Sequence, residues 1–388
     1  MGIDPDLPAS SAPATTPPGA RLRVAVDVTS LIGERTGVGH VTAAVVEHLA
    51  ARPEVALVAY ALTRDRRRAT AMALPPGVAL RITGVPALAL FAAWRRGPAP
   101  RAERWTGPVD VVHGTNFVVP PARAATVVTV HDVAFAREPE LVTPASRRFT
   151  GLLRAAIRRG AFVHVFSEAV GDEVVTLLDC PAERVVCIRP GVAATGGGDP
   201  VRGRARAGAE AYVLALGTVE PRKNLPRLVA AFDRVAAHDP ALRLVVAGPD
   251  GWGTDAFGAA VGAAAHGDRV VRLGYVTDAD RRDLLAGARV LAYPSLDEGF
   301  GHPPLEAMGA GTPVVAARAG ALPEVLGTAA LLPDPRSVDA IADALRAALT
   351  DDDVRARLVA AGHERARHYS WSRTADELVA LYQRAVRR

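Results

Sequence analysis

The chain has 388 residues, 49% of them hydrophobic, and its 46 lysine and arginine side chains outnumber its 41 carboxylates, giving a formal net charge of +5 at pH 7. This composition excludes a fibrous or intrinsically disordered protein, and the length predicts two domains of about 150 to 200 residues each. Nucleic-acid binding is disfavoured, because it requires a concentrated basic stripe with interleaved aromatic residues and only 5% of the residues are aromatic.

Residues 1–20 are rich in Pro, Ala, Ser and Thr and contain neither a basic stretch nor an apolar one. They are predicted to form a disordered tail rather than a signal peptide. The longest apolar run, near Val85 to Trp94, is too short to span a bilayer, so we expect a cytoplasmic protein. Cys180 and Cys187 are expected to be buried apolar residues rather than part of a disulfide framework or a metal site.

Short β-branched runs alternate with helical patterns along two stretches of the chain. In the first stretch we expect strands at 22–28, 55–61, 109–114, 126–132, 162–167 and 185–188, with helices at about 40–51, 146–159 and 168–179. In the second we expect strands at 212–217, 242–248, 270–274, 290–295, 313–317 and 329–333, followed by helices at 336–349, 351–368 and 371–386. This alternation predicts an α/β protein whose parallel sheets are covered on both faces.

The segment 191–211 is rich in glycine and arginine and lacks periodicity, which favours an interdomain linker at 194–210. We therefore predict Rossmann-like domains over 21–193 and 211–370, and a final helix over 371–388 that could pack back on the first domain. Ligands of parallel sheets bind beyond the carboxyl ends of the strands, so a ligand cleft is expected between the two domains.

The stretch GTVEPRKNLPRL, residues 217–228, follows one of these strands and contains Lys223, the only lysine in the chain. Asn224, followed by Leu225 and Pro226, is typical of a helix N-cap. Arg222 and Lys223 would then lie at a helix N-terminus, where free N–H groups and the helix dipole favour an anion. A guanidinium and an ammonium at this place form a good diphosphate clamp. The alternative is a solvated basic loop.

The stretch SLDEGFGHPPLEAMGAGTPVV, residues 295–315, follows another strand. Its glycines expose backbone N–H groups in a tight loop, and Pro303 and Pro304 begin a helix. Glu298 in the loop and Glu306 in the helix are too far apart in sequence to be i, i+4 neighbours, but both could face a ligand at the helix N-terminus. Carboxylates are strong acceptors for sugar hydroxyls. The alternative, a pair of surface glutamates, is disfavoured by the neighbouring phosphate clamp.

EGFGHPPLEAMGAGTPVV resembles the E-x7-E signature of the retaining GT-B glycosyltransferases of glycosyltransferase family 4, and GTVEPRKNL resembles the diphosphate loop of that family. The similarity extends from RVAVDVTSLIGERTGVGH through HDVAF to the last helices. It implies a GT-B fold, with two Rossmann-like domains facing each other across a cleft. It also implies transfer of a hexose from a nucleotide diphosphate sugar, with GDP-mannose suggested by the N-terminal half, to a glycan or lipid-linked acceptor. No cofactor or metal is expected to be required.

The resemblance also implies residue roles. Glu306 would bind the ribose hydroxyls, and His131 would reach the donor sugar near its reacting carbon. Arg222 and Lys223 would neutralise the leaving diphosphate, and with His131 and Glu298 they are the expected catalytic residues. The other implied donor-binding residues are Gly37, Gly39, Gly217, Tyr275, Val276, Gly299, Phe300, Gly301 and Leu305. At Arg189-Pro190-Gly191 the family often has an asparagine before the glycine, so no role is carried over there.

Several other polar residues near strand ends have a structural interpretation as well as a functional one. His113 and His164 are expected to be hydrogen-bonded core residues, and the side chain of His302 could point away from the ligand. Asp132 could orient His131 or cap the following turn. Ser167 and Glu168 could touch the acceptor or cap a helix.

Four other functions are compatible with parts of this pattern. A glycoside hydrolase would use the two glutamates but would not need a phosphate clamp. A phosphorylase would need Lys223 as a Schiff-base lysine, which an exposed helix start disfavours. A nucleotide-sugar 2-epimerase and a catalytically silent nucleotide-sugar-binding protein would share the same fold.

Residues 88–105 and 146–162 mix apolar residues with arginine, so they could contact an anionic membrane or form ordinary helices with solvated arginine faces.

Overall fold

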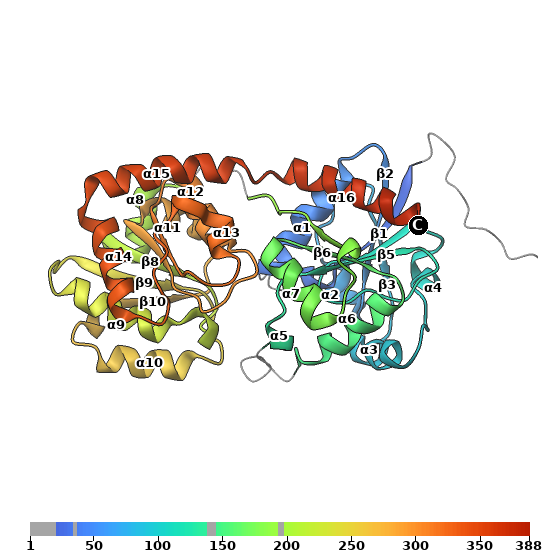
Figure 1. Ribbon diagram of the computed structural model, residues 1–388, viewed down its shortest axis with the longest axis horizontal. Coiled ribbons are helices and arrows are strands. Elements are labelled where there is room, and N and C mark those ends of the chain that lie inside the picture. The colour runs from blue at the N-terminus through green and yellow to red at the C-terminus, as the bar shows by residue number, and fades with distance from the viewer. Residues whose placement is uncertain (1–20, 34–36, 138–144, 193–197) are drawn as a thin grey trace, which may run out of the picture.

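The computed structural model describes residues 21–33, 37–137, 145–192 and 198–388, and it forms two lobes lying side by side (Figure 1). The predicted tail, residues 1–20, lies outside the described residues. Each lobe is a parallel sheet with helices on both faces, which confirms the predicted α/β class and the two-domain GT-B architecture. Within the described residues, no helix is long and apolar enough to cross a membrane.

The first lobe contains a seven-stranded sheet of order β3-β2-β1-β4-β5-β6-β7. The six predicted strands are present as β1 (Leu22–Asp27), β2 (Val55–Ala61), β4 (Val111–Gly114), β5 (Ala125–Val130), β6 (Phe162–Val165) and β7 (Val185–Cys187). The sequence did not reveal β3 (Ala79–Ile82), because this short edge strand is only half buried and carries no β-branched run. The helices of this lobe are α1 (Gly37–Ala50), α2 (Arg66–Thr70), α3 (Ala87–Arg96), α4 (Glu103–Thr106), α5 (Ala134–Arg137), α6 (Arg148–Arg158) and α7 (Glu168–Leu178).

The second lobe contains a five-stranded sheet of order β10-β9-β8-β11-β12. Its strands are β8 (Ala211–Leu216), β9 (Leu242–Ala247), β10 (Val270–Gly274), β11 (Val290–Tyr293) and β12 (Val314–Ala316). The predicted strand at 329–333 is wrong, since this segment makes only an isolated bridge from Leu331 to Val315. The helices are α8 (Pro200–Ala207), α9 (Leu225–Ala236), α10 (Thr254–Ala263), α11 (Asp278–Gly287), α12 (His302–Gly309), α13 (Leu322–Leu326), α14 (Val338–Thr350) and α15 (Asp352–Arg367).

The segment expected to be an interdomain linker at 194–210 contains a helix within its described residues. Asp199 caps α8 through its side chain, and Arg202 pairs with Asp283 of α11 at 2.8 Å. A methyl group on Gly203 would overlap the Asp283 carbonyl oxygen, so this glycine allows α8 to pack closely on α11. The glycine and arginine content that suggested a linker therefore serves a helix contact in the second lobe.

The last helix, α16 (Trp371–Val386), crosses from the second lobe and packs on α1, β4 and β5 of the first (Figure 1). Its Tyr382 hydroxyl donates to His113 Nδ1 (2.7 Å), and His113 Nε2 donates to Thr129 Oγ1 (2.8 Å). The Thr129 hydroxyl then donates to His164 Nδ1 (2.9 Å), and His164 Nε2 donates to the Ile188 carbonyl (3.1 Å). These donor directions follow because a carbonyl can only accept, so the proton of His164 is on Nε2 and its Nδ1 is an acceptor. His113 and His164 are thus satisfied core residues, as expected.

The strand orders place one switch point in each sheet, between β1 and β4 and between β8 and β11. At such a point the connections leave the strands in opposite directions and open a crevice at their carboxyl ends. Buried valine and leucine residues fill both sheets and fix their registers. The fold therefore directs the loops that follow β8 and β11 toward the space between the lobes.

Candidate functional site

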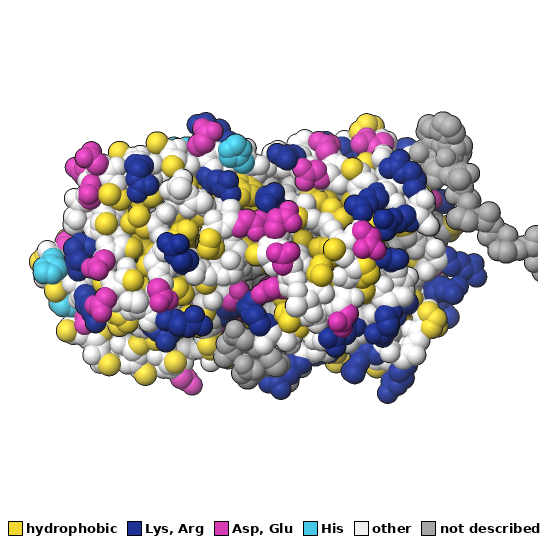
Figure 2. Space-filling view, viewed as in Figure 1, with side chains coloured by type: hydrophobic (Ala, Val, Ile, Leu, Met, Phe, Trp, Pro, Cys, Tyr) yellow, Lys and Arg dark blue, Asp and Glu magenta, His cyan; other side chains and the backbone are white. Residues whose placement is uncertain are grey.

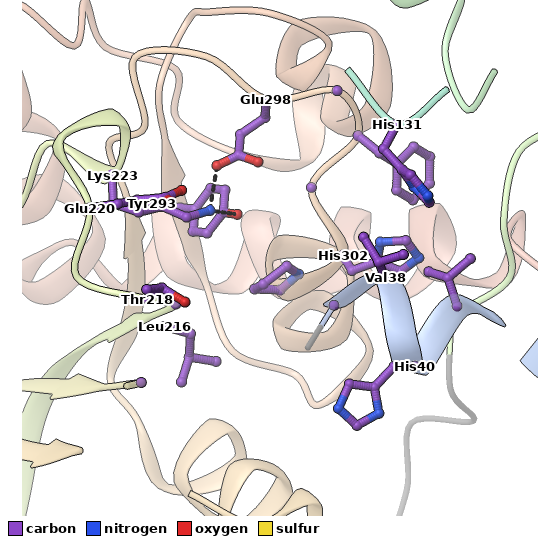
Figure 3. A pocket seen from close by; sticks show the side chains of 18 of the residues that line it. Val38, His40, His131, Leu216, Thr218, Glu220, Lys223, Tyr293, Glu298 and His302 are labelled. Atoms are coloured by element: carbon purple, nitrogen blue, oxygen red, sulfur yellow. Dashed lines mark hydrogen bonds and ion pairs between the residues drawn. The ribbon is translucent and has the colours of Figure 1, made fainter. Parts of the chain in front are cut away.

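A cleft of about 540 Å³ lies between the lobes, and we call it the interlobe cleft. Its first-lobe wall comes from the start of α1 and from the ends of β5 and β6. Its second-lobe wall comes from the loops after β8, β9, β10 and β11. Figure 3 shows Val38, His40 and His131 on one side of the cleft and Glu220, Lys223 and Tyr293 on the other. This volume suits a small organic ligand.

Glu298 lies at the centre of an ion-pair cluster in the second-lobe wall. Lys223 Nζ donates to Glu298 Oε1 (2.6 Å), and Arg222 Nη1 lies 2.9 Å from Glu298 Oε2. Only 8% of Glu298 is exposed. Burial by itself would raise the pKa of Glu298, but the two adjacent cations outweigh burial and hold that pKa at about 2. The three side chains that the sequence linked to donor binding are therefore in direct contact.

The exposed helix start expected for Lys223, which disfavoured a phosphorylase, is not observed. Its side chain is only 12% exposed, and Nζ also donates to the Tyr293 hydroxyl at 2.7 Å. The lysine stem passes over Gly217, where a methyl group would lie 3.1 Å from Lys223 Cε. The φ of +135° at Gly217 also disfavours other residues. The unbranched lysine stem fits beside Gly217 and brings its ammonium to Tyr293 and Glu298.

Asn224 occupies the N-cap position of α9, but its side chain does not cap the helix. Instead, Nδ2 donates to the carbonyl oxygens of Pro294 (3.0 Å) and Pro335 (2.7 Å). Asn224 has a φ of +58°, a left-handed conformation that asparagine tolerates better than most residues. The N-cap prediction was therefore right about the place and wrong about the contact. Asn224 ties the loop after β8 to the end of β11, and so holds Arg222 and Lys223 against Glu298.

Glu306 lies on α12, and its carboxylate pairs with an arginine that was not predicted from the sequence. Arg281 Nη1 donates to both oxygens of Glu306, at 2.9 and 2.8 Å. Arg281 lines the interlobe cleft, whereas Glu306 is not among its lining residues. Burial raises the pKa of Glu306 despite this arginine. Arg281 Nε is buried and has no hydrogen-bond partner among the described residues.

The glycine loop after β11 packs directly on the first lobe. A methyl group on Gly299 would overlap the His131 carbonyl oxygen, and Ser167 Oγ donates to the Gly299 carbonyl at 2.9 Å. Ser167 also caps α7, which is the capping role expected for it, and it does not line the interlobe cleft. Gly301 has a φ of +104°, which sets the turn into α12. Position 299 therefore needs a glycine because the two lobes meet there.

His131 lines the interlobe cleft and is neutral in the folded chain. Its Nε2 donates to the Thr115 carbonyl (2.9 Å), so Nδ1 carries no proton and can accept a hydrogen bond. Burial lowers the pKa of His131 to about 4. The neighbouring Asp132 accepts from the backbone of Ala134 at 3.1 Å, which is the capping role, and it also lines the cleft.

The remaining predicted residues divide into two groups. Gly37, Gly217, Tyr275, Val276, Phe300 and Gly301 line the interlobe cleft. Gly39 and Leu305 are buried behind its walls and do not line it. Cleft-lining residues that the sequence reading did not assign include His40, Glu220, Asp278 and Arg281. Glu220, Asp278 and Arg281 belong to the second lobe, and His40 reaches the cleft from α1 of the first.

Two family models together match most of the chain. Residues 35–195 match "Glycosyltransferase Family 4", and residues 202–365 match "Glycosyl transferases group 1". The O-antigen chain mannosyltransferase B of Escherichia coli is 32% identical over 286 residues, covering 70% of this chain and 74% of that protein. The chain is a group 1 glycosyltransferase.

Solved structures of low identity share the fold of this glycosyltransferase. A sucrose-phosphate synthase from Thermosynechococcus elongatus superposes with a TM-score of 0.76 at 20% identity, covering 94% of this chain and 99% of that one. Anabaena Alr3699/HepE, solved in complex with UDP and glucose, gives a TM-score of 0.73 at 17% identity, covering 94% and 100% of the two chains. At these identities the likeness establishes the fold alone.

Further contacts hold the two lobes of the glycosyltransferase together around the cleft. Arg137 of α5 pairs with Asp297 at 2.6 Å. Glu324 of α13 accepts from the backbone N–H groups of Glu168 and Ala169 at the start of α7, both at 3.1 Å. Glu324 also pairs with Arg189 at 2.8 Å. A carboxylate at a helix N-terminus is favourable, so Glu324 acts as a capping group supplied by the opposite lobe.

Proposed function

We propose that this glycosyltransferase moves mannose from GDP-mannose to a hydroxyl of a glycan or lipid-linked acceptor, with retention of the anomeric configuration. The observation that carries the proposal is the buried contact of Glu298 with Arg222 and Lys223 at the interlobe cleft. The Glu298 carboxylate can accept hydrogen bonds from sugar hydroxyls, and the two cations in contact with it, Arg222 and Lys223, can bind a diphosphate.

The leaving group would be stabilised by this cluster. As the bond between the sugar C1 and the diphosphate oxygen breaks, positive charge develops on the sugar ring and negative charge on the diphosphate. Arg222 and Lys223 are fixed before the reaction, so they can stabilise that negative charge without reorganising. Glu298 keeps both cations oriented and offers its remaining lone pairs to the sugar hydroxyls.

The acceptor oxygen would attack C1 from the face that the diphosphate leaves. The C1–oxygen bond to the acceptor forms, the bond to the diphosphate breaks, and the acceptor proton passes to the departing diphosphate oxygen. This step balances without an enzyme nucleophile. The neutral Nδ1 of His131 would accept a hydrogen bond from a hydroxyl of the donor sugar, a role that its low pKa of about 4 preserves at neutral pH.

Guanine as the donor base is supported by a complementary pair of side chains. The Arg281 guanidinium lines the interlobe cleft, and guanine offers O6 and N7 as acceptors for such a group. Asp278 also lines the interlobe cleft and can accept from the guanine N1–H and N2–H groups. The two side chains lie 3.4 Å apart. Glu306 does not line the interlobe cleft and would act through Arg281, whose Nη1 donates to both of its oxygens and is thereby held in place.

Mannose as the sugar is supported by the relative of Escherichia coli whose name specifies mannosyl transfer. The deciding experiment is a thermal-shift screen against GDP-, UDP-, dTDP- and ADP-sugars, followed by product analysis with and without a mannosylated acceptor. We expect GDP-mannose to give the largest shift, and GDP release to require the acceptor. A free epimerised sugar formed without acceptor would instead identify an epimerase, and binding without any product would identify a silent binding protein.

A membrane-linked acceptor has support in the first lobe. Figure 2 shows Lys and Arg side chains concentrated at the lower right, over the region of α3, α4 and α6 in Figure 1. At α3, Leu88 is 61% exposed and Val85, just before the helix, is 39% exposed, although Trp94 is buried in the core. We propose that this edge contacts an anionic membrane. Sedimentation with phosphatidylglycerol vesicles tests it, and Leu88→Glu should abolish co-sedimentation without changing turnover on a soluble acceptor.

A further inference from the structure

A second cavity, of about 630 Å³, lies between the edge strand β7 and the junction of α15 with α16, and we call it the crossover cavity. It shares no lining residue with the interlobe cleft. Its walls come from both lobes, since β7 belongs to the first sheet and α15 to the second lobe. The residues Val186, Ile188 and Leu381 give it an apolar floor. The volume lies within the range of small-molecule sites.

Four arginines line the crossover cavity: Arg189, Arg365, Arg373 and Arg384. Among its lining residues, all of which lie in the described part of the chain, Glu377 is the one carboxylate, and it pairs with Arg373 at 2.8 Å. Arg189 pairs with Glu324 at 2.8 Å. Arg189 also lies 4.0 Å from Glu168, so three carboxylates against the four arginines leave a net charge of +1.

The other two arginines bind only neutral acceptors among the described residues. Arg365 donates to the backbone carbonyls of Glu324 (2.6 Å) and Val325 (2.7 Å). Arg384 donates to the carbonyl of Glu183 at 2.6 Å. A carbonyl oxygen satisfies a guanidinium N–H but does not cancel its charge. These contacts therefore fix the positions of the two guanidinium groups while leaving their positive charges to a ligand.

The spacing along α16 concentrates the charge on one face. Arg373, Glu377, Leu381 and Arg384 follow each other at intervals of three or four residues, so they lie along one side of the helix. This face turns toward β7 and the end of α15. The cavity therefore combines four lining arginines with apolar lining residues. That combination matches a phosphate group carried on an organic body, and it does not match a neutral sugar or a cation.

We propose that the crossover cavity is a binding site for a phosphate-bearing ligand, distinct from the site of the donor diphosphate. The ligand would contact α16 and β7 of the first lobe together with α15 of the second. It would therefore favour the arrangement of the lobes in which these walls converge. Two sources share this chemistry, a soluble organic phosphate and the head group of an anionic lipid.

The test is calorimetric titration of the full chain with pyrophosphate in the presence of saturating GDP, which removes the interlobe cleft from the measurement. We expect the wild-type chain to retain a pyrophosphate-binding event. The double variant Arg373→Gln/Arg384→Gln should weaken it by about tenfold or more, because two charge-assisted contacts are lost. Arg367→Gln is the matched control, since this exposed arginine of α15 lies outside the crossover cavity and should bind as wild type.

Phosphatidylglycerol vesicles provide the second arm. Co-sedimentation that requires Arg373 and Arg384 would assign the site to a lipid head group, and pyrophosphate binding that requires them would assign it to a soluble phosphate. The proposal is overturned if, with all variants folded by circular dichroism, neither arm depends on these two arginines. GDP affinity is titrated separately, so a failure of GDP to bind would fault the proposed function and not this site.

Discussion

Replacing Lys223 by methionine tests the diphosphate clamp with the least disturbance to packing. Methionine keeps the unbranched stem that passes over Gly217 but removes the ammonium that contacts Glu298 at 2.6 Å and Tyr293 at 2.7 Å. The loss of one fixed donor to a developing anion costs about 2.7–4 kcal/mol of transition-state stabilisation, or roughly 10²- to 10³-fold in kcat. We expect a fall in kcat of that size.

The folded state should be much less affected. Lys223 is buried, so its removal relieves a desolvation cost while Arg222 still pairs with Glu298. The assay is GDP release with saturating acceptor, accompanied by thermal unfolding of each variant. Arg234→Met, which removes an exposed cation from α9, is the control and should keep wild-type kcat. A folded Lys223→Met variant with kcat within about threefold of wild type would refute the clamp.

Three further outcomes follow from the geometry. Arg281→Met should reduce the preference for GDP over UDP by about tenfold or more in competition binding, since a good base contact is worth about 1–3 kcal/mol. An unchanged preference would show that Arg281 does not recognise the base. Gly299→Ala should abolish transfer, because its methyl group overlaps the His131 carbonyl, and small-angle scattering should show the lobes further apart; a compact, active variant would contradict this contact. Burial lowers the pKa of His131 and that of His164 to about 4, so below pH 6.5 the unfolded chain binds protons that the folded chain does not, and stability falls as the pH falls toward 4. Urea titrations should therefore show stability falling over this window, and a smaller fall in His131→Gln.

The alternation of strands and helices was predictable because buried parallel strands require continuous β-branched runs. Those runs located eleven of the twelve strands within the described residues, and β3 escaped because an edge strand needs no such run. Helix α8, within the expected linker at 194–210, was missed for a different reason. Gly203 suggests a break in a helix when the sequence is considered alone, but it is required where α8 meets α11.

The second-lobe part of the site was predictable because Arg222, Lys223 and Glu298 follow strands that neighbour each other across a switch point. The Arg281 contact with Glu306 was not, since nothing in the spacing of these residues requires α11 and α12 to approach. The same limit applies to Glu324, which caps a helix of the opposite lobe. Contacts between lobes depend on their relative placement, and no local sequence pattern encodes it.

The stereochemistry of transfer tests the central claim most directly. GDP-α-mannose and a mannosylated lipid-linked acceptor would be incubated with the enzyme, and the one-bond C1–H1 coupling of the new linkage would be measured by NMR. The proposed mechanism predicts an α-linked product, formed together with one GDP per linkage and lost in Lys223→Met. A β-linked product, or GDP release that does not depend on the acceptor, would contradict it.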